Sequence, residues 1–375
     1  MRTTFHRRTA LAAAGLLAAA TAVLPARPAA ASIAEDAVFF ASPSSDQVVV
    51  LAGGMRTSVT AFPTAHVLAG HFPSTAGAQA FLYNPGPGPD GLLDVERNGD
   101  SLKTQFTPAP VGGTFRPVVA DLDLDGNDDI FWYAPGTARD YVWFFEDDGS
   151  ITSVPMTVNL DAQPVPLLVD GINDQPSRQG ILWYGPGAKA DSLWLFSGRN
   201  ASARRVSIAG NYRITVGSFF SRNFGQSAQQ VLFYDPAGGR NSIWSFHRGD
   251  GAHRSDPVPS PGRSYIPVVT KAGMHGADYV YWYGSGPNPE KVWGFDSAGR
   301  VDGGSMRSIN GTYRVLRDAQ GRSGAEEVIL LDGTTAARSV QLAPEHAPAL
   351  GTITPITGLP RAPRGASTWF EEPVS

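Results

Sequence analysis

The sequence predicts an all-β protein, a seven-bladed β-propeller whose blades are four-stranded antiparallel sheets. The first observation behind this prediction is an aromatic strand sequence that returns about every 50 residues, a period typical of repeat architectures. The second is the abundance of turn formers, with 42 Gly and 30 Pro among 375 residues. The third is an apolar content of 42% with 10% aromatic residues, which supports a large core and argues against disorder.

The repeated sequence is a short apolar segment followed by a turn, as expected for a buried strand. Successive side chains of a strand point to opposite faces, so these segments are apolar on both faces and belong in sheets covered on both sides. Seven copies predict seven blades. The copies are Val38-Phe39-Phe40, Phe81-Leu82-Tyr83, Phe131-Trp132-Tyr133, Leu182-Trp183-Tyr184, Leu232-Phe233-Tyr234, Tyr281-Trp282-Tyr283 and Ile329-Leu330-Leu331.

A second repeated sequence keeps the same step and ends in a tryptophan. Hairpin turns such as Asp148-Gly149 follow it, and β-branched runs such as Ile214-Thr215-Val216 precede the first repeated sequence. Each unit therefore provides four short strands. The tryptophans are Trp143, Trp194, Trp244 and Trp293.

The two ends of the repeat region predict how the blades close into a ring. The first unit begins directly at its second strand, Val38–Ser42, whereas a spare strand, Ser367-Thr368-Trp369-Phe370, follows the last unit. We expect this C-terminal strand to join the N-terminal blade as its innermost strand. The propeller then occupies residues 36–373 as a single domain.

Met1–Ala31 has the organisation of a cleaved export signal. Its apolar run, Ala10–Leu24, is shorter than the ~20 residues of a membrane span and ends at Pro25. Adjacent Arg7 and Arg8 fit the twin-arginine signature in part, which leaves the export route open. We therefore expect a secreted, extracellular protein that does not span a membrane. Without any cysteine it forms no disulfides.

The stretch from Asp121 to Asp129 has the spacing of a calcium loop. Calcium prefers six to eight oxygen ligands, and short loops supply them from alternate residues around a glycine at a sharp bend, here Gly126. Trp132 occupies the position at which an EF-hand has its bidentate Glu, so the loop is not an EF-hand. A solvated acidic turn is the alternative. The expected ligands are Asp121, Asp123, Asp125, Asn127 and Asp129.

This D-x-D-x-D-G-x-x-D pattern between two strands resembles the FG-GAP (VCBS-type) repeat of the integrin alpha-subunit propeller and of many secreted bacterial proteins. The resemblance covers the region from about Val38 to Gly358 and is most specific at Asp121–Asp129. It implies a β-propeller in which calcium, the one cofactor expected, lies between the first two strands of a blade and stiffens them.

A polar residue recurs three positions before each tryptophan of the second repeated sequence. Such a residue beside aromatic rings, repeated around a propeller, would suit a multivalent carbohydrate site. Alternatively, it is a turn residue that bonds its own backbone, and the aromatic rings are blade packing. The candidate ligand-binding residues are Asp140, Trp143, Asp191, Trp194, Asn241, Trp244, Glu290 and Trp293.

Other motifs carry less weight. Arg248-Gly249-Asp250 is the integrin-recognition tripeptide, but it coincides with a repeat turn, and His66 and His71 lack a carboxylate partner at metal-ligand spacing. The sequence has no G-x-S-x-G, H-E-x-x-H or P-loop motif, and its net charge of −4 does not favour nucleic acid.

We expect a non-catalytic, lectin-like or surface-interaction protein whose partner is extracellular carbohydrate or a cell-surface protein. The alternatives are a propeller-fold hydrolase or lyase acting on polysaccharide, with no catalytic residue identifiable, and a protein-interaction subunit of a secreted assembly.

Overall fold

The fold consists of strands joined by turns and loops. The computed structural model describes residues 37–42, 44–52, 55–64, 66–73, 77–169, 177–219, 229–246, 253–270, 278–296, 300–305, 308–318, 327–332, 337–343, 349–356 and 364–367. All regular secondary structure in these ranges is β, as the sequence predicts. Ser32–Ser375 forms one compact unit, and the predicted export signal Met1–Ala31 lies outside the described residues.

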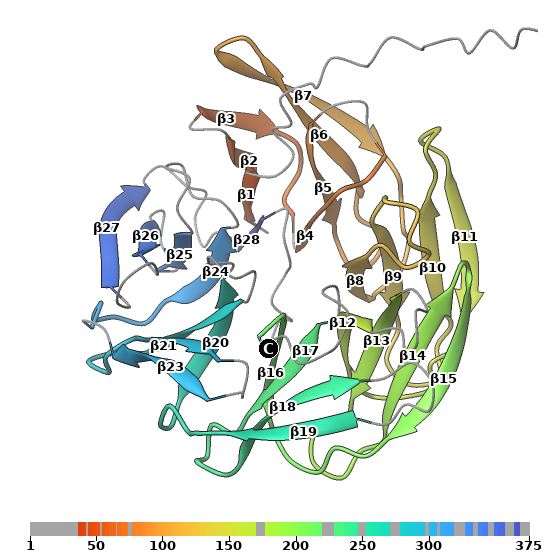
Figure 1. Ribbon diagram of the computed structural model, residues 1–375. Coiled ribbons are helices and arrows are strands. Elements are labelled where there is room, and N and C mark those ends of the chain that lie inside the picture. The colour runs from red at the N-terminus through yellow and green to blue at the C-terminus, as the bar shows by residue number, and fades with distance from the viewer. Residues whose placement is uncertain are drawn as a thin grey trace, which may run out of the picture. The chain divides into compact units, whose positions relative to one another are not determined.

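The strands form four-stranded antiparallel sheets, numbered here 1 to 7 along the chain (Figure 1). Sheet 1 contains β28 (Arg364–Ser367), β1 (Ala37–Ser42), β2 (Ser45–Ala52) and β3 (Met55–Thr60). Sheet 2 contains β4 (His66–Gly70), β5 (Ala78–Tyr83), β6 (Gly91–Asn98) and β7 (Ser101–Pro108). Sheet 3 contains β8 (Arg116–Ala120), β9 (Asp129–Tyr133), β10 (Asp140–Phe145) and β11 (Ile151–Met156).

The remaining sheets repeat this order. Sheet 4 contains β12 (Gln163–Val169), β13 (Arg178–Tyr184), β14 (Asp191–Ser197) and β15 (Asn200–Val206). Sheet 5 contains β16 (Arg213–Gly217), β17 (Gln230–Tyr234), β18 (Asn241–Phe246) and β19 (His253–Val258). Sheet 6 contains β20 (Tyr265–Thr270), β21 (Tyr279–Gly284), β22 (Lys291–Phe295) and β23 (Val301–Ser305). Sheet 7 contains β24 (Arg314–Asp318), β25 (Glu327–Leu331), β26 (Ala337–Ala343) and β27 (Ala349–Ile356).

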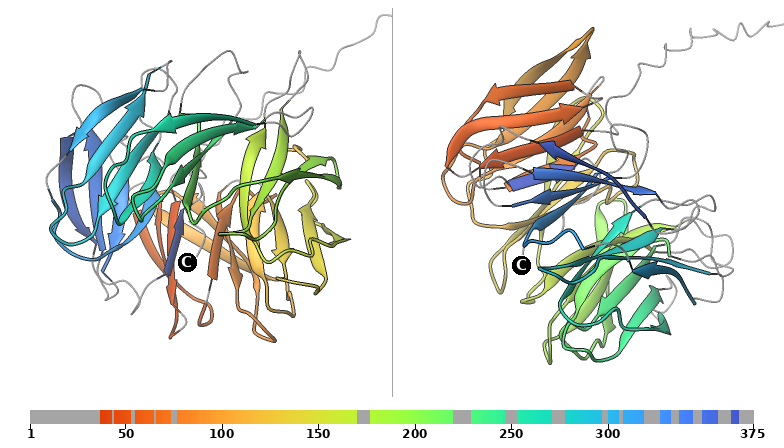
Figure 2. Two further views of the ribbon diagram at one scale, coloured as in Figure 1. Left: turned by 90° about the horizontal axis from the view of Figure 1, so that it is seen from below. Right: turned by 90° about the vertical axis from the view of Figure 1, so that its left-hand side faces the viewer.

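Sheet 1 combines strands from the two ends of the repeat region. The blue strand β28 pairs antiparallel with the red strand β1, with Ser367 opposite Val38 and Arg364 opposite Ala41 (Figures 1 and 2). The expected strand began at Ser367, so the paired segment lies three residues earlier. Aromatic content located the expected strand, whereas the residues that pair are Arg364, Gly365, Ala366 and Ser367. Trp369 and Phe370 lie outside the described residues.

The first strands of neighbouring sheets contact one another. The contacts join β4 to β8, β8 to β12, β12 to β16, β16 to β20 and β20 to β24. In addition, β28 contacts both β24 and β4.

Aromatic residues of the second strands fill the space between neighbouring sheets. Trp132 of sheet 3 packs on Phe81 and Tyr83 of sheet 2, with ring centroids 5.5 and 5.0 Å apart. Trp183 of sheet 4 packs in the same way on Phe131 and Tyr133, at 5.2 and 4.8 Å. These buried rings form the core between sheets, which explains why the strands are apolar on both faces.

A tyrosine at or next to the end of each of five second strands has a second role. In sheet 3, the Tyr133 hydroxyl donates to Leu160 O and accepts from Ala162 N at 3.1 Å, so it holds the segment that leads to β12. Tyr83, Tyr184, Tyr234 and Tyr283 make the corresponding pairs of bonds in their own sheets. Each hydroxyl therefore fixes the entry into the next sheet.

Candidate functional site

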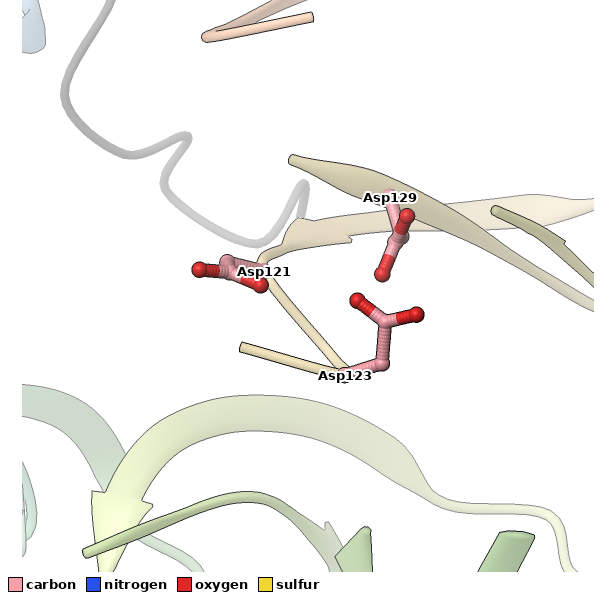
Figure 3. A group of neighbouring side chains, drawn as sticks. All are labelled: Asp121, Asp123 and Asp129. Carbon is pink, nitrogen blue, oxygen red and sulfur yellow. The ribbon is translucent and has the colours of Figure 1, made fainter. Parts of the chain in front are cut away.

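The loop between β8 and β9 brings three carboxylates together (Figure 3). Asp121 and Asp123 come from the loop and Asp129 is the first residue of β9. One oxygen of each lies within 4.8 Å of the others. This convergence of hard oxygen donors fits a divalent cation such as calcium.

Backbone amides shape the loop around its carboxylates. Asp121 accepts hydrogen bonds from Asp125 N and Gly126 N, each at 3.1 Å, and Asp125 Oδ1 accepts from Asn127 N at 2.8 Å. Gly126 has φ +99°, a conformation that side chains disfavour, which accounts for the glycine at the bend. Leu124 also has a positive φ, 63°.

The electrostatics of the loop oppose ionisation of its acids. Burial raises the pKa of Asp129 to about 8, although hydrogen bonds from Phe145 N and Leu122 N lower it, and the charges of Asp123 and Asp125 raise it further. Burial and neighbouring carboxylates also raise the pKa of Asp121 and Asp123. A bound cation would remove this repulsion. In the described structure, Asp123 Oδ1 is buried without a hydrogen-bond partner.

The other two predicted calcium ligands, Asp125 and Asn127, do not join the group of three carboxylates. The Asp125 side chain is exposed and bonded to Asn127, outside the group of three. Asn127 is buried, and its Nδ2 donates to Asp147 Oδ1 at 3.0 Å. In the calcium loop expected from the sequence, Asn127 contributes only its backbone carbonyl as a ligand.

Asp128, which the sequence analysis did not single out, ties the loop to sheet 2. Its Oδ2 accepts from His71 N and its N donates to His71 O, both at 2.7 Å, so both backbone groups of one residue are bound. Burial raises the pKa of Asp128 to about 6. The same two-bond bracket joins Gln229 to Leu168 and Asp278 to Ser218. A polar residue just before the second strand is the sequence signal that could have identified it.

The repeated polar residues proposed for carbohydrate are buried where the third strands begin or just before. Both oxygens of Asp140 accept backbone hydrogen bonds, from Ala134 N at 2.8 Å and Val158 N at 2.7 Å. Asp191 does the same with Gly185 N and Ile208 N, both at 2.7 Å. The geometry favours the turn-residue interpretation, because these carboxylates hold their own sheet's backbone.

Asn241 shows why its sheet uses an amide at this position. Its Oδ1 accepts from Asp235 N at 2.8 Å, as the aspartates do. The residue on the other side is Pro259, which has no N–H to donate, and Asn241 Nδ2 instead donates to Pro259 O at 3.3 Å. The side chain thus matches the hydrogen-bonding groups around it.

Glu290 departs from the pattern. Its Oε2 accepts from Ile309 N at 2.9 Å, but its Oε1 is buried with no partner among the described residues. Burial raises the pKa of this carboxyl. The neighbouring Trp143, Trp194 and Trp244 are partly buried against rings of the core, and Trp293 is 7% exposed.

The remaining motifs have varied placements. His66 stacks on Tyr83 with ring centroids 5.7 Å apart, whereas His71 lies beside Asp128. Arg248-Gly249-Asp250 lies outside the described residues. Within the described part of the chain, no helix is long and apolar enough to cross a membrane.

No family model and no curated protein matches the sequence, so the FG-GAP resemblance stays a prediction. Solved structures do match. A periplasmic gluconolactonase from Pseudomonas aeruginosa aligns with a TM-score of 0.56 and 14% identity, covering 88% of this chain and 99% of that chain. A putative 6-phosphogluconolactonase from Bacteroides uniformis aligns with a TM-score of 0.56 and 12% identity, covering 88% and 98%.

A protein from Lactobacillus plantarum aligns with a TM-score of 0.52 and 12% identity, over 88% of this chain and 98% of that chain. At such low identities these similarities describe the fold alone. Together with the four-stranded antiparallel sheets, they show that the protein has a β-propeller fold.

Proposed function

We propose that the protein is a secreted, calcium-stabilised β-propeller of the FG-GAP type that binds extracellular carbohydrate without catalysis. Seven blades in a closed ring are part of this proposal. The pairing of β28 with β1, together with the contacts of β28 with β4 and β24, supports closure. A closed ring leaves no first strand without a neighbour on either side.

The convergence of Asp121, Asp123 and Asp129 is the observation that carries the calcium assignment. Asp129 also accepts from Phe145 N at 3.1 Å, so a cation on this carboxylate would stiffen the contact between β9 and β10. The role is structural, since the ion would lie among carboxylates of a single loop.

The calcium assignment has a direct test. Asp123→Ala should lower the melting temperature and abolish its dependence on added calcium. Asp100→Ala, which changes an exposed hairpin carboxylate in sheet 2, serves as the matched control. Identical melting of the wild-type protein in calcium and in chelator would show that the loop is merely acidic.

The binding role is supported by the hydrogen bonds that fix the connections between the strands. Tyrosine hydroxyls and buried carboxylates fix the connections between and within sheets, so the exposed residues of those connections are presented in fixed positions. Preorganised surfaces bind at lower entropic cost. A glycan and polysaccharide array probed with the purified protein, in calcium and in chelator, tests this role. Selective glycan binding supports it, and a folded protein that binds no glycan contradicts it.

A hydrolase is the second candidate, because two of the structural neighbours are described as gluconolactonases, one of them putative. It requires acidic or histidine side chains from several blades to converge on one substrate. Assays for lactone hydrolysis and for polysaccharide cleavage distinguish this candidate from pure binding. Turnover that survives purification to homogeneity would favour the enzyme.

A further inference from the structure

An aromatic residue followed by an arginine occurs at the entry of three first strands. The pairs are Phe115-Arg116 at β8, Tyr212-Arg213 at β16 and Tyr313-Arg314 at β24. Each arginine is the first residue of its strand and lies opposite the last residue of the second strand. These aromatic–arginine pairs therefore stand at equivalent positions in sheets 3, 5 and 7.

The backbone of each pair is held in place. The amide of each aromatic residue donates to the tyrosine hydroxyl of its neighbouring second strand, at 2.7 Å for Phe115 and 2.8 Å for Tyr212 and Tyr313. The aromatic rings are half-buried and the arginines are exposed. The pairs thus present a ring and a guanidinium from a fixed backbone.

Two of the arginines reach toward the next sheet. Arg213 donates to Tyr265 O at the start of β20, and Arg116 Nη1 lies 4.0 Å from Asp161 Oδ1, just before β12. Lys189 also pairs with Asp161, at 2.6 Å, and holds the pKa of that carboxyl below its ordinary value. These contacts place the side chains around the entries of the first strands.

Few ion pairs hold the cations at these entries. Asp161 serves two cations, and Arg213 and Lys291 donate to the neutral carbonyls of Tyr265 and Pro261. The ion pairs of the described residues include no carboxylate for Arg213, Lys291 or Arg314.

At the ends of the sheets away from the first-strand entries, two of the cations have carboxylate partners. There Arg199 pairs with Glu146 and Arg300 with Asp296, and the acidic loop Asp121–Asp129 adds negative charge. Arg213 and Arg314 thus have no ion-pair partner among the described residues, while Asp235 and the buried carboxylates Asp140, Asp191 and Glu290 lie at the same ends of the sheets.

We propose that the three aromatic–arginine pairs bind an acidic polysaccharide, with the guanidinium groups on sugar carboxylates and the rings against sugar faces. Arginine matches carboxylate geometry with two parallel hydrogen bonds, and aromatic rings supply flat apolar contact. Repetition in alternate sheets suits a ligand that carries many charges. This inference rests on the proposed carbohydrate binding and specifies its substrate class.

The test uses short oligogalacturonate and its methyl ester, which has the same sugar backbone without the charge, titrated calorimetrically into the full chain at fixed calcium. We expect the wild-type protein to bind the ester at least about tenfold more weakly. Arg116→Ser/Arg314→Ser should weaken oligogalacturonate binding about tenfold or more. The control, Arg204→Ser/Arg205→Ser, removes the same charge from two exposed residues of the outer strand β15 and should bind as the wild type does.

Several outcomes overturn the inference. Equal binding of the acid and the ester does so with the wild-type protein alone, and so does an equal loss in both double variants. Tighter binding of a single-stranded RNA of matching charge would assign the pairs to nucleic acid. Binding of neutral glycans with none of oligogalacturonate would leave the proposed function standing and refute only this inference, whereas binding of no glycan refutes both.

Discussion

Replacing the buried carboxylate of Asp140 should show how much its two hydrogen bonds to backbone amides contribute to the free energy of unfolding. Asp140 is fully buried, and its two oxygens are the acceptors for Ala134 N and Val158 N. Asp140→Ala leaves both N–H groups buried without partners, at about 1–3 kcal/mol each. Burial raises the pKa of Asp140, so removing the charge recovers part of this cost. We therefore expect a net loss of about 2–4 kcal/mol.

That loss converts into a measurable change in melting temperature. At about 2.1 cal/mol/K per residue, the roughly 340 residues of Ser32–Ser375 give an unfolding entropy near 0.7 kcal/mol/K. The expected decrease in Tm is therefore about 3–6 °C. Differential scanning calorimetry at neutral pH in calcium measures it, with Asp100→Ala as the exposed control.

Reciprocal substitutions at Asp140 and Asn241 test whether each side chain matches its backbone partners. Asp140→Asn turns an N–H toward Val158 N, and Asn241→Asp turns a second carboxylate oxygen toward Pro259 O, so both should destabilise the protein at neutral pH. Protonated, the introduced carboxyl can donate to Pro259 O, which raises its folded pKa above the unfolded value. The stability that this hydrogen bond contributes is then present at low pH and is lost as the pH rises through the folded pKa. An Asn241→Asp variant that melts like the wild type at neutral pH would refute this account of the bracket.

Three further predictions concern the loop, the closing strand and the tyrosines. The pKa of Asp129 in the folded protein is about 8, so in chelator its contribution to stability is present at low pH and is lost as the pH rises to 8. Asp129→Asn should therefore flatten the dependence of Tm on pH. An unchanged slope would contradict the raised pKa of Asp129. Truncation before Arg364 removes β28 and should lower the Tm of the whole unit, whereas unchanged melting would argue against closure by this strand. Tyr133→Phe deletes the hydrogen bonds to Leu160 and Ala162 and should lower the free energy of unfolding, measured in urea, by about 1–3 kcal/mol. The exposed control Asp100→Ala should leave it unchanged.

Local patterns in the sequence predicted the sheets well. The apolar run around Trp132 and Tyr133 and the turn sequences that follow are properties of a few neighbouring residues, so the strands could be located from them. The acidic loop was equally visible, because its spacing lies within nine residues, Asp121–Asp129.

Side-chain contacts between distant segments could not be predicted in the same way. Asp128 bonds to His71 in another sheet, and the hydroxyl of Tyr133 bonds to Ala162 in the connection to the next sheet. The sequence shows this tyrosine only as an apolar ring, because its hydroxyl partner appears only in the folded chain. Carboxylates such as Asp140 looked available for a ligand, since sequence gives no burial.

The pairing of β28 with β1 also has a kinetic consequence. All six residues of β1 are buried in the finished sheet, yet β1 obtains its partner on one side only when residues from the far end of the chain arrive. Contacts between such distant segments form slowly, and an unpaired strand edge is open to proteases and to other chains in the meantime. We therefore expect refolding to end in a slow phase, during which sheet 1 is the most vulnerable part of the molecule.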